Sequence, residues 1–88
     1  MHWGLEFTAI GMADLVARDR PIQRQILDRL VWLAENFEHI KLEPLHAEWK
    51  DYFKLRVGDW RVAYTFDVSK KVIKVHRIDR RDKVYKRR

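Results

Sequence analysis

A glycine and an aspartate, Gly58 and Asp59, separate two runs of residues that alternate between apolar and polar side chains. A two-residue connection of this kind joins antiparallel strands, because glycine readily takes a positive φ. The segment 53–64, which reads FKLRVGDWRVAY, is therefore predicted to form a β-hairpin. Its register would place Arg56 directly opposite Arg61.

The predicted hairpin has one apolar face and one basic face, because side chains alternate with period two along a strand. The apolar face, which we expect to join the core, contains Phe53, Leu55, Val57, Trp60, Val62 and Tyr64. The basic face contains Lys54, Arg56 and Arg61. Like charges opposite each other destabilise a sheet by a few tenths to about 1 kcal/mol, so a bound anion would relieve the repulsion. The alternative is a basic face that is simply solvated.

Composition limits the class of protein. Residues 1–88 suffice for one domain with one core, and 47% of them are hydrophobic. The chain has no cysteine, no metal-ligand spacing, no P-loop and no dinucleotide-binding glycine pattern, so we expect neither a metal nor a cofactor. We also expect no signal peptide, because no basic region followed by a long apolar stretch is seen. No apolar run is long enough for a membrane, and we expect a cytoplasmic location.

Positive charge is concentrated in one half of the chain. Residues 1–44 contain five Lys/Arg and seven Asp/Glu, for a net charge of −2, whereas residues 45–88 contain 14 and six, for a net charge of +8. Such asymmetry is typical of proteins that bind a polyanion, nucleic acid first, although an acidic protein would be attracted equally well.

Two helices are predicted before the hairpin. Alternation of Trp3, Leu5 and Phe7 indicates a short strand. Thr8 can cap a helix over residues 9–17, and Pro21 suits the first turn of a second helix. Apolar side chains at helical spacing support this second helix: Ile22, Ile26, Leu30, Leu33 and Phe37.

After this helix, residues 40–49 are predicted to form a loop. Residues 71–78 are predicted to form a third strand of the C-terminal meander, with Lys74 and His76 on the basic side. Ile78 breaks the alternation, which indicates either a bulge or the end of the strand near Arg77. A basic tail begins at about residue 80. The order β-α-α-β-β-β predicts an α+β fold in which both helices pack on one face of an antiparallel sheet.

Clustered arginine, lysine and tyrosine side chains can support metal-free RNA cleavage. The 2′-hydroxyl attacks the adjacent phosphorus, and arginines stabilise the negative charge on the phosphoryl oxygens. Lysine and tyrosine can exchange protons, and tyrosine can stack on a base. The same residue types also make a surface that only binds phosphates, so composition alone leaves both functions open.

The hairpin and the basic segment 77–85, which reads RIDRRDKVY, resemble the RelE/ParE superfamily of bacterial toxins over nearly the whole chain. The resemblance implies a toxin of a toxin–antitoxin system with a cognate antitoxin. RelE-like members cut mRNA on the ribosome, and ParE-like members poison DNA gyrase. Of the two, we expect RelE-like activity, with a non-catalytic RNA-binding module as a further alternative.

The resemblance also suggests roles for individual residues. It places Lys54, Arg61, Arg81 and Tyr85 in catalysis. Arg56 is the basic neighbour of Lys54, and RNA contacts are expected from Arg56, Lys74, Arg80 and Lys86. Tyr52 stands where some relatives carry a further lysine, which leaves the general base open, and Glu43 is a candidate for it.

Overall fold

The computed structural model describes residues 2–45 and 50–80. Its elements, in chain order, are β1 (Gly4–Phe7), α1 (Ala9–Val16), α2 (Arg20–Asn36), a 3-10 turn (Phe37–His39), β2 (Glu43–Pro44), β3 (Phe53–Val57), β4 (Trp60–Asp67) and β5 (Val72–Arg80). Thr8 caps α1 as predicted, with its hydroxyl oxygen accepting from the backbone N–H of Gly11 at 2.9 Å.

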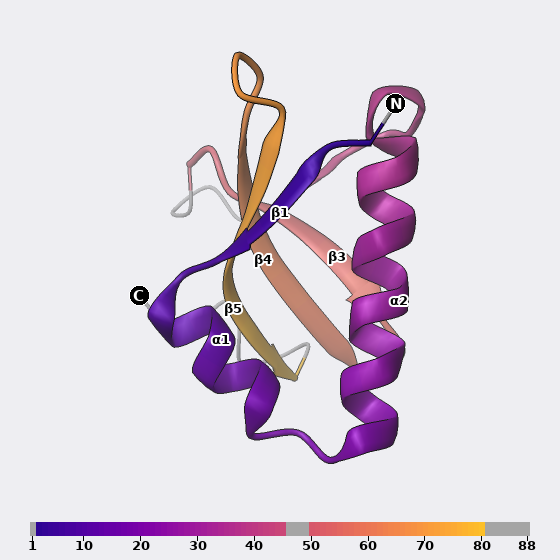
Figure 1. The fold of residues 1–88 in the computed structure, drawn as a ribbon, viewed down its shortest axis with the longest axis vertical. Helices are drawn as coiled ribbons and strands as arrows, with labels where there is room; N and C mark the ends of the chain where they lie inside the picture. The colour runs from indigo at the N-terminus through magenta and orange to yellow at the C-terminus, as the bar shows by residue number, and fades with distance from the viewer. Residues whose placement is uncertain (1, 46–49, 81–88) are drawn as a thin grey trace.

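The strands form one sheet in the order β1-β5-β4-β3-β2, and the predicted α+β class is confirmed (Figure 1). The sheet differs from the prediction in two details. The expected loop 40–49 contains the two-residue strand β2, which pairs with Phe53 and Lys54 of β3. In addition, β1 runs parallel to β5, whereas the other neighbours are antiparallel. A strand of two residues, one of them proline, is too short to show alternation in the sequence.

The predicted hairpin register is confirmed at all five pairs between β3 and β4, including Arg56 opposite Arg61. Gly58 has φ +59°, the conformation for which glycine is suited at the first position of a two-residue turn.

Of the two alternatives near Arg77, the structure shows the bulge, and the strand continues to Arg80. The pairing of β4 with β5 shifts by one residue between Ala63 and Tyr64, and the extra residue on β5 is His76. The bulge changes the parity of β5, so that Ile78 returns to the core and is only 2% exposed.

The two helices form a V, and their apolar sides pack on the same face of the sheet (Figure 1). The core between them contains Leu15 of α1 and four residues of α2 (Ile26, Leu30, Leu33 and Ala34), which meet Leu55, Val57, Val62, Tyr64, Ile73, Val75 and Ile78 of the sheet. Predicted core residue Trp60 is only partly buried at the rim of this cluster.

Helix α1 lies unusually close to β5. The backbone N–H of Thr8 donates to the carbonyl oxygen of Val75 at 3.0 Å. A Cβ atom at Gly11 would collide with the same carbonyl oxygen, so only glycine fits at this point of the helix. Glycine lowers helix propensity, but at position 11 it permits the contact between α1 and β5.

We predict that Gly11→Ala lowers the free energy of unfolding by roughly 1–3 kcal/mol, because overpacking forces the helix away from β5. Helix propensity alone predicts the opposite sign, a gain of roughly 0.5–1 kcal/mol. Urea denaturation distinguishes the two. Gly4→Ala is the control, because a Cβ there would meet Val72 Cγ2 at an ordinary 3.5 Å. A stabilised Gly11→Ala variant would contradict the close contact.

Candidate nucleic-acid interface

Arg61 lies on the predicted basic face, but its side chain is not a solvated cation. The residue is only 7% exposed, and its Nη1 donates to the carbonyl oxygens of Gly58 at 3.1 Å and Trp60 at 2.9 Å. These two bonds fix the guanidinium against the hairpin turn. Its Nε and Nη2 donors make no hydrogen bond to another described residue. The orientation of the guanidinium is thus fixed through Nη1, while its other two nitrogens remain available to a ligand.

Arg56, opposite Arg61, has a partner that the sequence analysis did not assign to it. Its Nε donates to Glu43 Oε1 at 3.2 Å, and its Nη2 lies 3.2 Å from Glu43 Oε2. Strand β2 positions this carboxylate, so the repulsion between the two arginines is offset from within the chain. Both side chains are about half exposed, and a pair in this setting is worth at most about 1 kcal/mol.

Lys54 lies beside this pair, at a shallow hollow between α2 and β3. The hollow has a volume of about 180 Å³, and its lining includes Glu43, Lys54 and Arg56 together with Trp32 and Lys41. A larger, open depression of about 590 Å³ lies along the start of α2 and contains none of the predicted site residues. The hollow at Lys54 thus brings together three of the predicted site residues, and Arg61 is not among its lining residues.

The remaining predicted RNA contacts are not brought to this place. Lys74 pairs with Thr65, four residues along β4 from Arg61, which is roughly 13 Å of strand at about 3.3 Å per residue. Arg80 pairs with Trp60 and therefore shares the helix-covered face instead. The register places Asp79, an acidic residue, across from Arg61.

The face opposite the helices is also less open than predicted. Ala63 at its centre is fully buried, and it packs with Leu45 and Tyr52. The backbone N–H of Leu45 donates to the carbonyl oxygen of Tyr52 at 3.0 Å, which extends the pairing of β2 with β3. This small apolar cluster separates the basic residues at the turn end from those at Lys74.

His76, the bulge residue, lies next to this apolar cluster. Its Nε2 is 2.8 Å from Thr65 Oγ1, and its ring contacts Tyr52 edge-on, with 4.9 Å between ring centroids. Burial, followed by the charge of Lys74, lowers the pKa of His76. The neutral imidazole is therefore favoured at this position, as expected of a strand residue with satisfied contacts.

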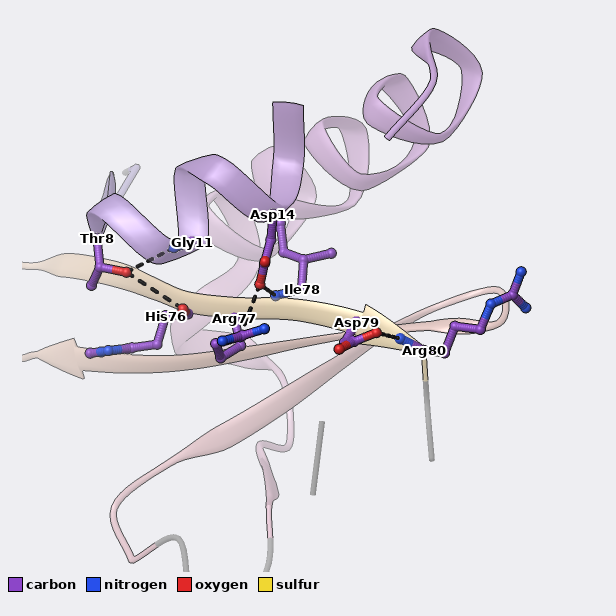
Figure 2. A network of polar contacts seen from close by, with 8 residues as sticks. All are labelled: Thr8, Gly11, Asp14, His76, Arg77, Ile78, Asp79 and Arg80. Carbon is purple, nitrogen blue, oxygen red and sulfur yellow. Dashed lines mark hydrogen bonds and ion pairs between the residues drawn. The ribbon is translucent and has the colours of Figure 1, made fainter. Parts of the chain in front are cut away.

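Helix α1 covers the edge of β5 beyond the end of β1 (Figure 2). Asp14 Oδ2 accepts from the backbone N–H of Ile78 at 2.9 Å and lies 3.0 Å from Arg77 Nε. The Thr8 hydroxyl makes a longer contact, 3.5 Å, to the carbonyl oxygen of His76. These contacts hold the last part of β5, from which the Arg80 side chain extends away from Asp14 (Figure 2).

Three predicted site residues, Arg81, Tyr85 and Lys86, lie outside the described residues, and their roles stay predictions. Tyr64 belongs to the core, and burial raises its pKa, which makes it unsuited to proton transfer near neutral pH. Within residues 2–45 and 50–80, no group of three or more acidic or histidine side chains could hold a metal ion. No helix in the described part of the chain is long and apolar enough to cross a membrane.

Sequence reasoning missed two charged partners. Asp14 is the one polar residue of the apolar helix α1, a signal that could have marked it. Glu43 was noticed only as a base, because nothing in the sequence predicts that a two-residue strand pairs beside Arg56. Both depend on contacts between segments far apart in the chain.

The chain matches a known protein family over most of its length. Residues 7–85 match the family described as the ParE toxin of type II toxin–antitoxin systems. The chain belongs to the RelE/ParE superfamily of type II toxins. The match covers the hairpin, both helices and β5, and the predicted family is thereby confirmed. The comparison with curated proteins gives no match.

Solved structures share the fold of this toxin at low sequence identity. The toxin–antitoxin complex RelBE2 from Mycobacterium tuberculosis aligns with a TM-score of 0.81 and 22% identity, over 92% of this chain and 93% of that one. A free mutant of Escherichia coli RelE gives 0.73 and 22%, over 91% and 84%. A YoeB/ParE toxin from Agrobacterium tumefaciens gives 0.70 and 20%, over 88% and 96%.

His76 should make the stability of the toxin depend on pH. Folding lowers the pKa of His76, so the unfolded chain binds more protons than the folded one at mildly acidic pH. The contribution of His76 to the free energy of unfolding is therefore complete above the unfolded pKa of about 6.5, and it is lost as the pH falls through that value. We expect His76→Gln to lose less stability than wild type between about pH 7.5 and about pH 5.5. Urea denaturation at both pH values measures this. His39→Gln, at an exposed position, should fall as much as wild type.

Proposed function

We propose that this toxin is a metal-independent endoribonuclease that cuts mRNA on the ribosome. The observation that carries the proposal is the fixed guanidinium of Arg61, which two backbone carbonyls hold on the same sheet face as Lys54 and Arg56. A donor whose direction is set before the substrate arrives requires little reorganisation when charge develops.

In the proposed reaction, the 2′-oxygen of a nucleotide forms a bond to the adjacent phosphorus, and the bond from phosphorus to the 5′-oxygen breaks. A base accepts the proton of the 2′-hydroxyl, and an acid supplies a proton to the departing 5′-oxygen. Arg61 would donate to the phosphoryl oxygens through Nε and Nη2, and Lys54 would act from the neighbouring strand. Arg81 and Tyr85 remain proposed members of this site from the resemblance.

Glu43 fits a positioning role better than that of the general base. Both of its oxygens face Arg56, at 3.2 Å, so its carboxylate is already engaged. Its effect in the proposed site is to orient Arg56 for the RNA backbone.

A cognate antitoxin is the proposed protein partner. The similar structures include toxin–antitoxin complexes from Mycobacterium tuberculosis and Pyrococcus horikoshii. An antitoxin segment with acidic residues would complement the basic surface formed by Lys54, Arg56 and Arg61, and would thereby block RNA from it.

A ParE-like gyrase inhibitor is the second candidate, because the family that matches residues 7–85 is described by its ParE members. The two functions differ in what is damaged in growing cells. Mapping of mRNA 5′ ends after brief induction of the toxin separates them. Codon-phased cuts in translated regions support the ribonuclease, whereas DNA breaks without such cuts support the gyrase inhibitor.

Arg61→Ala should lower the rate of single-turnover cleavage on mRNA-programmed ribosomes by about 10²–10³, as expected for loss of one oxyanion donor. Arg61→Lys should recover only part of the rate, because an ammonium group cannot reproduce the planar fork. Arg24→Ala, which removes an exposed arginine of α2, is the control and should cleave like wild type.

The Ala variant also loses the two bonds to the turn, each worth roughly 0.5–1.5 kcal/mol. The rates are therefore compared at a temperature where circular dichroism shows both proteins folded, and at equal ribosome occupancy. Wild-type cleavage by folded Arg61→Ala would refute the proposed role of Arg61.

Glu43→Gln separates the positioning role from the role of general base. If Glu43 only orients Arg56, the amide keeps one acceptor for Arg56 and cleavage should fall less than about 10-fold, whereas loss of a general base costs about 10²–10⁴. The same single-turnover assay measures this. A loss in the higher range would show that the carboxylate takes the proton.

A further inference from the structure

Two arginines from distant parts of the chain meet on one indole ring at the turn end of the hairpin. The guanidinium carbon of Arg18 lies 4.6 Å from the ring centroid of Trp60, and that of Arg80 lies 5.2 Å from it. Trp60 is partly buried at the rim of the core, and Arg80 is exposed. We call these three residues the Trp60 cluster.

The fold positions each member of the Trp60 cluster. The pairing of β4 with β5 places Trp60 opposite Arg80, on the same sheet face. Arg18 lies in the connection between α1 and α2, where its carbonyl oxygen accepts from the Gln23 side-chain amide at 2.7 Å and its backbone N–H donates to Leu15 at 3.1 Å. Backbone hydrogen bonds and strand pairing therefore fix the position of each of the three residues.

The charges of the Trp60 cluster are unbalanced. Each guanidinium is attracted to the face of the ring, but the two positive groups repel each other. Within residues 2–45 and 50–80, neither guanidinium forms an ion pair with a carboxylate, and the buried Nε of Arg18 has no hydrogen-bond partner. An anion that joined the two groups would relieve this repulsion.

We propose that the Trp60 cluster is a second binding site for the phosphate backbone of RNA, separate from the site at Arg61. Trp60 and Arg61 are consecutive residues of β4 and lie on opposite faces of the sheet. A single strand that passes around the turn end of the hairpin could therefore contact both sites. The choice of RNA as the ligand rests on the proposed function.

The chemistry of the cluster favours a nucleic acid over an acidic protein segment. Guanidinium groups form planar, paired hydrogen bonds with phosphate, and carboxylates would satisfy this part of the site equally well. A nucleotide in addition offers a base that can stack on an aromatic ring or on a guanidinium plane, which an acidic side chain does not. Trp60 and its two arginines supply such surfaces together.

The test uses the full chain and a fluorescein-labelled, fully 2′-O-methylated single strand of about 12 nucleotides, a length within the usual range of single-strand sites. This RNA cannot be cleaved through its 2′-oxygens. Fluorescence anisotropy over a range of salt concentrations gives the affinity and its salt slope. Loss of one phosphate contact lowers that slope by about 0.7 for a single strand.

We expect Arg18→Gln and Arg80→Gln each to weaken binding and to lower the slope by about 0.7, and Arg18→Lys to keep the slope because it keeps the charge. Arg24→Gln is the matched control, since it removes the same charge from an exposed position on α2. Thermal unfolding of each variant identifies losses that come from misfolding, and Arg18→Lys provides a second, milder change at the same position.

An unchanged slope for folded Arg18→Gln, or a change no larger than that of Arg24→Gln, would overturn the proposal. Weaker binding of labelled poly-glutamate with unchanged RNA binding would overturn it in favour of an acidic protein. The test also distinguishes this proposal from the proposed function. If the chain binds RNA through Arg18 but does not cut mRNA, the second binding site stands and the nuclease function is refuted. If the chain cuts mRNA but Arg18 has no effect on RNA binding, the nuclease function stands and the second binding site is refuted.

Discussion

The close contact of α1 with β5 is the constraint on which the rest of this toxin depends. Glycine at position 11 lets the helix backbone approach the carbonyl oxygen of Val75, and Thr8 bonds the same carbonyl. Asp14 then reaches the backbone N–H of Ile78, and the exposed edge of β5 is covered where β1 has ended. An uncovered edge would be open to pairing with another chain, so this contact also protects the sheet.

The same contact determines where the positive charges lie. Because α1 packs along β5, the connection to α2 begins near the end of β5, where Arg18 and Arg80 both lie close to the Trp60 ring. On the opposite face, the turn carbonyls fix Arg61 and the short strand β2 brings Glu43 to Arg56. The basic residues near the hairpin turn are thus divided between the two faces of the sheet, with Arg56 and Arg61 on one face and Arg80 on the other.

This division gives the structure a simple relation to its proposed chemistry. One arginine is held rigidly, as a group that meets developing charge should be. The others remain at the surface, where they can contribute affinity that depends on salt. A small apolar cluster at Ala63 separates them from Lys74, so the basic residues of the described part of this half do not form a single continuous patch.

The hairpin, its register and the family could be predicted from the sequence, because a Gly-Asp turn, period-two alternation and a basic motif are local features. Both helices could be predicted as well, and the change in parity along the last strand marked an irregularity near Arg77, which the strand pairing shows to be a bulge. Three features could not be predicted and are seen only in the folded chain: Arg61 is nearly buried, Glu43 binds Arg56, and two arginines lie against Trp60. These outcomes depend on which segments meet across the sheet, and residues far apart in the chain leave no periodic signal of their contact.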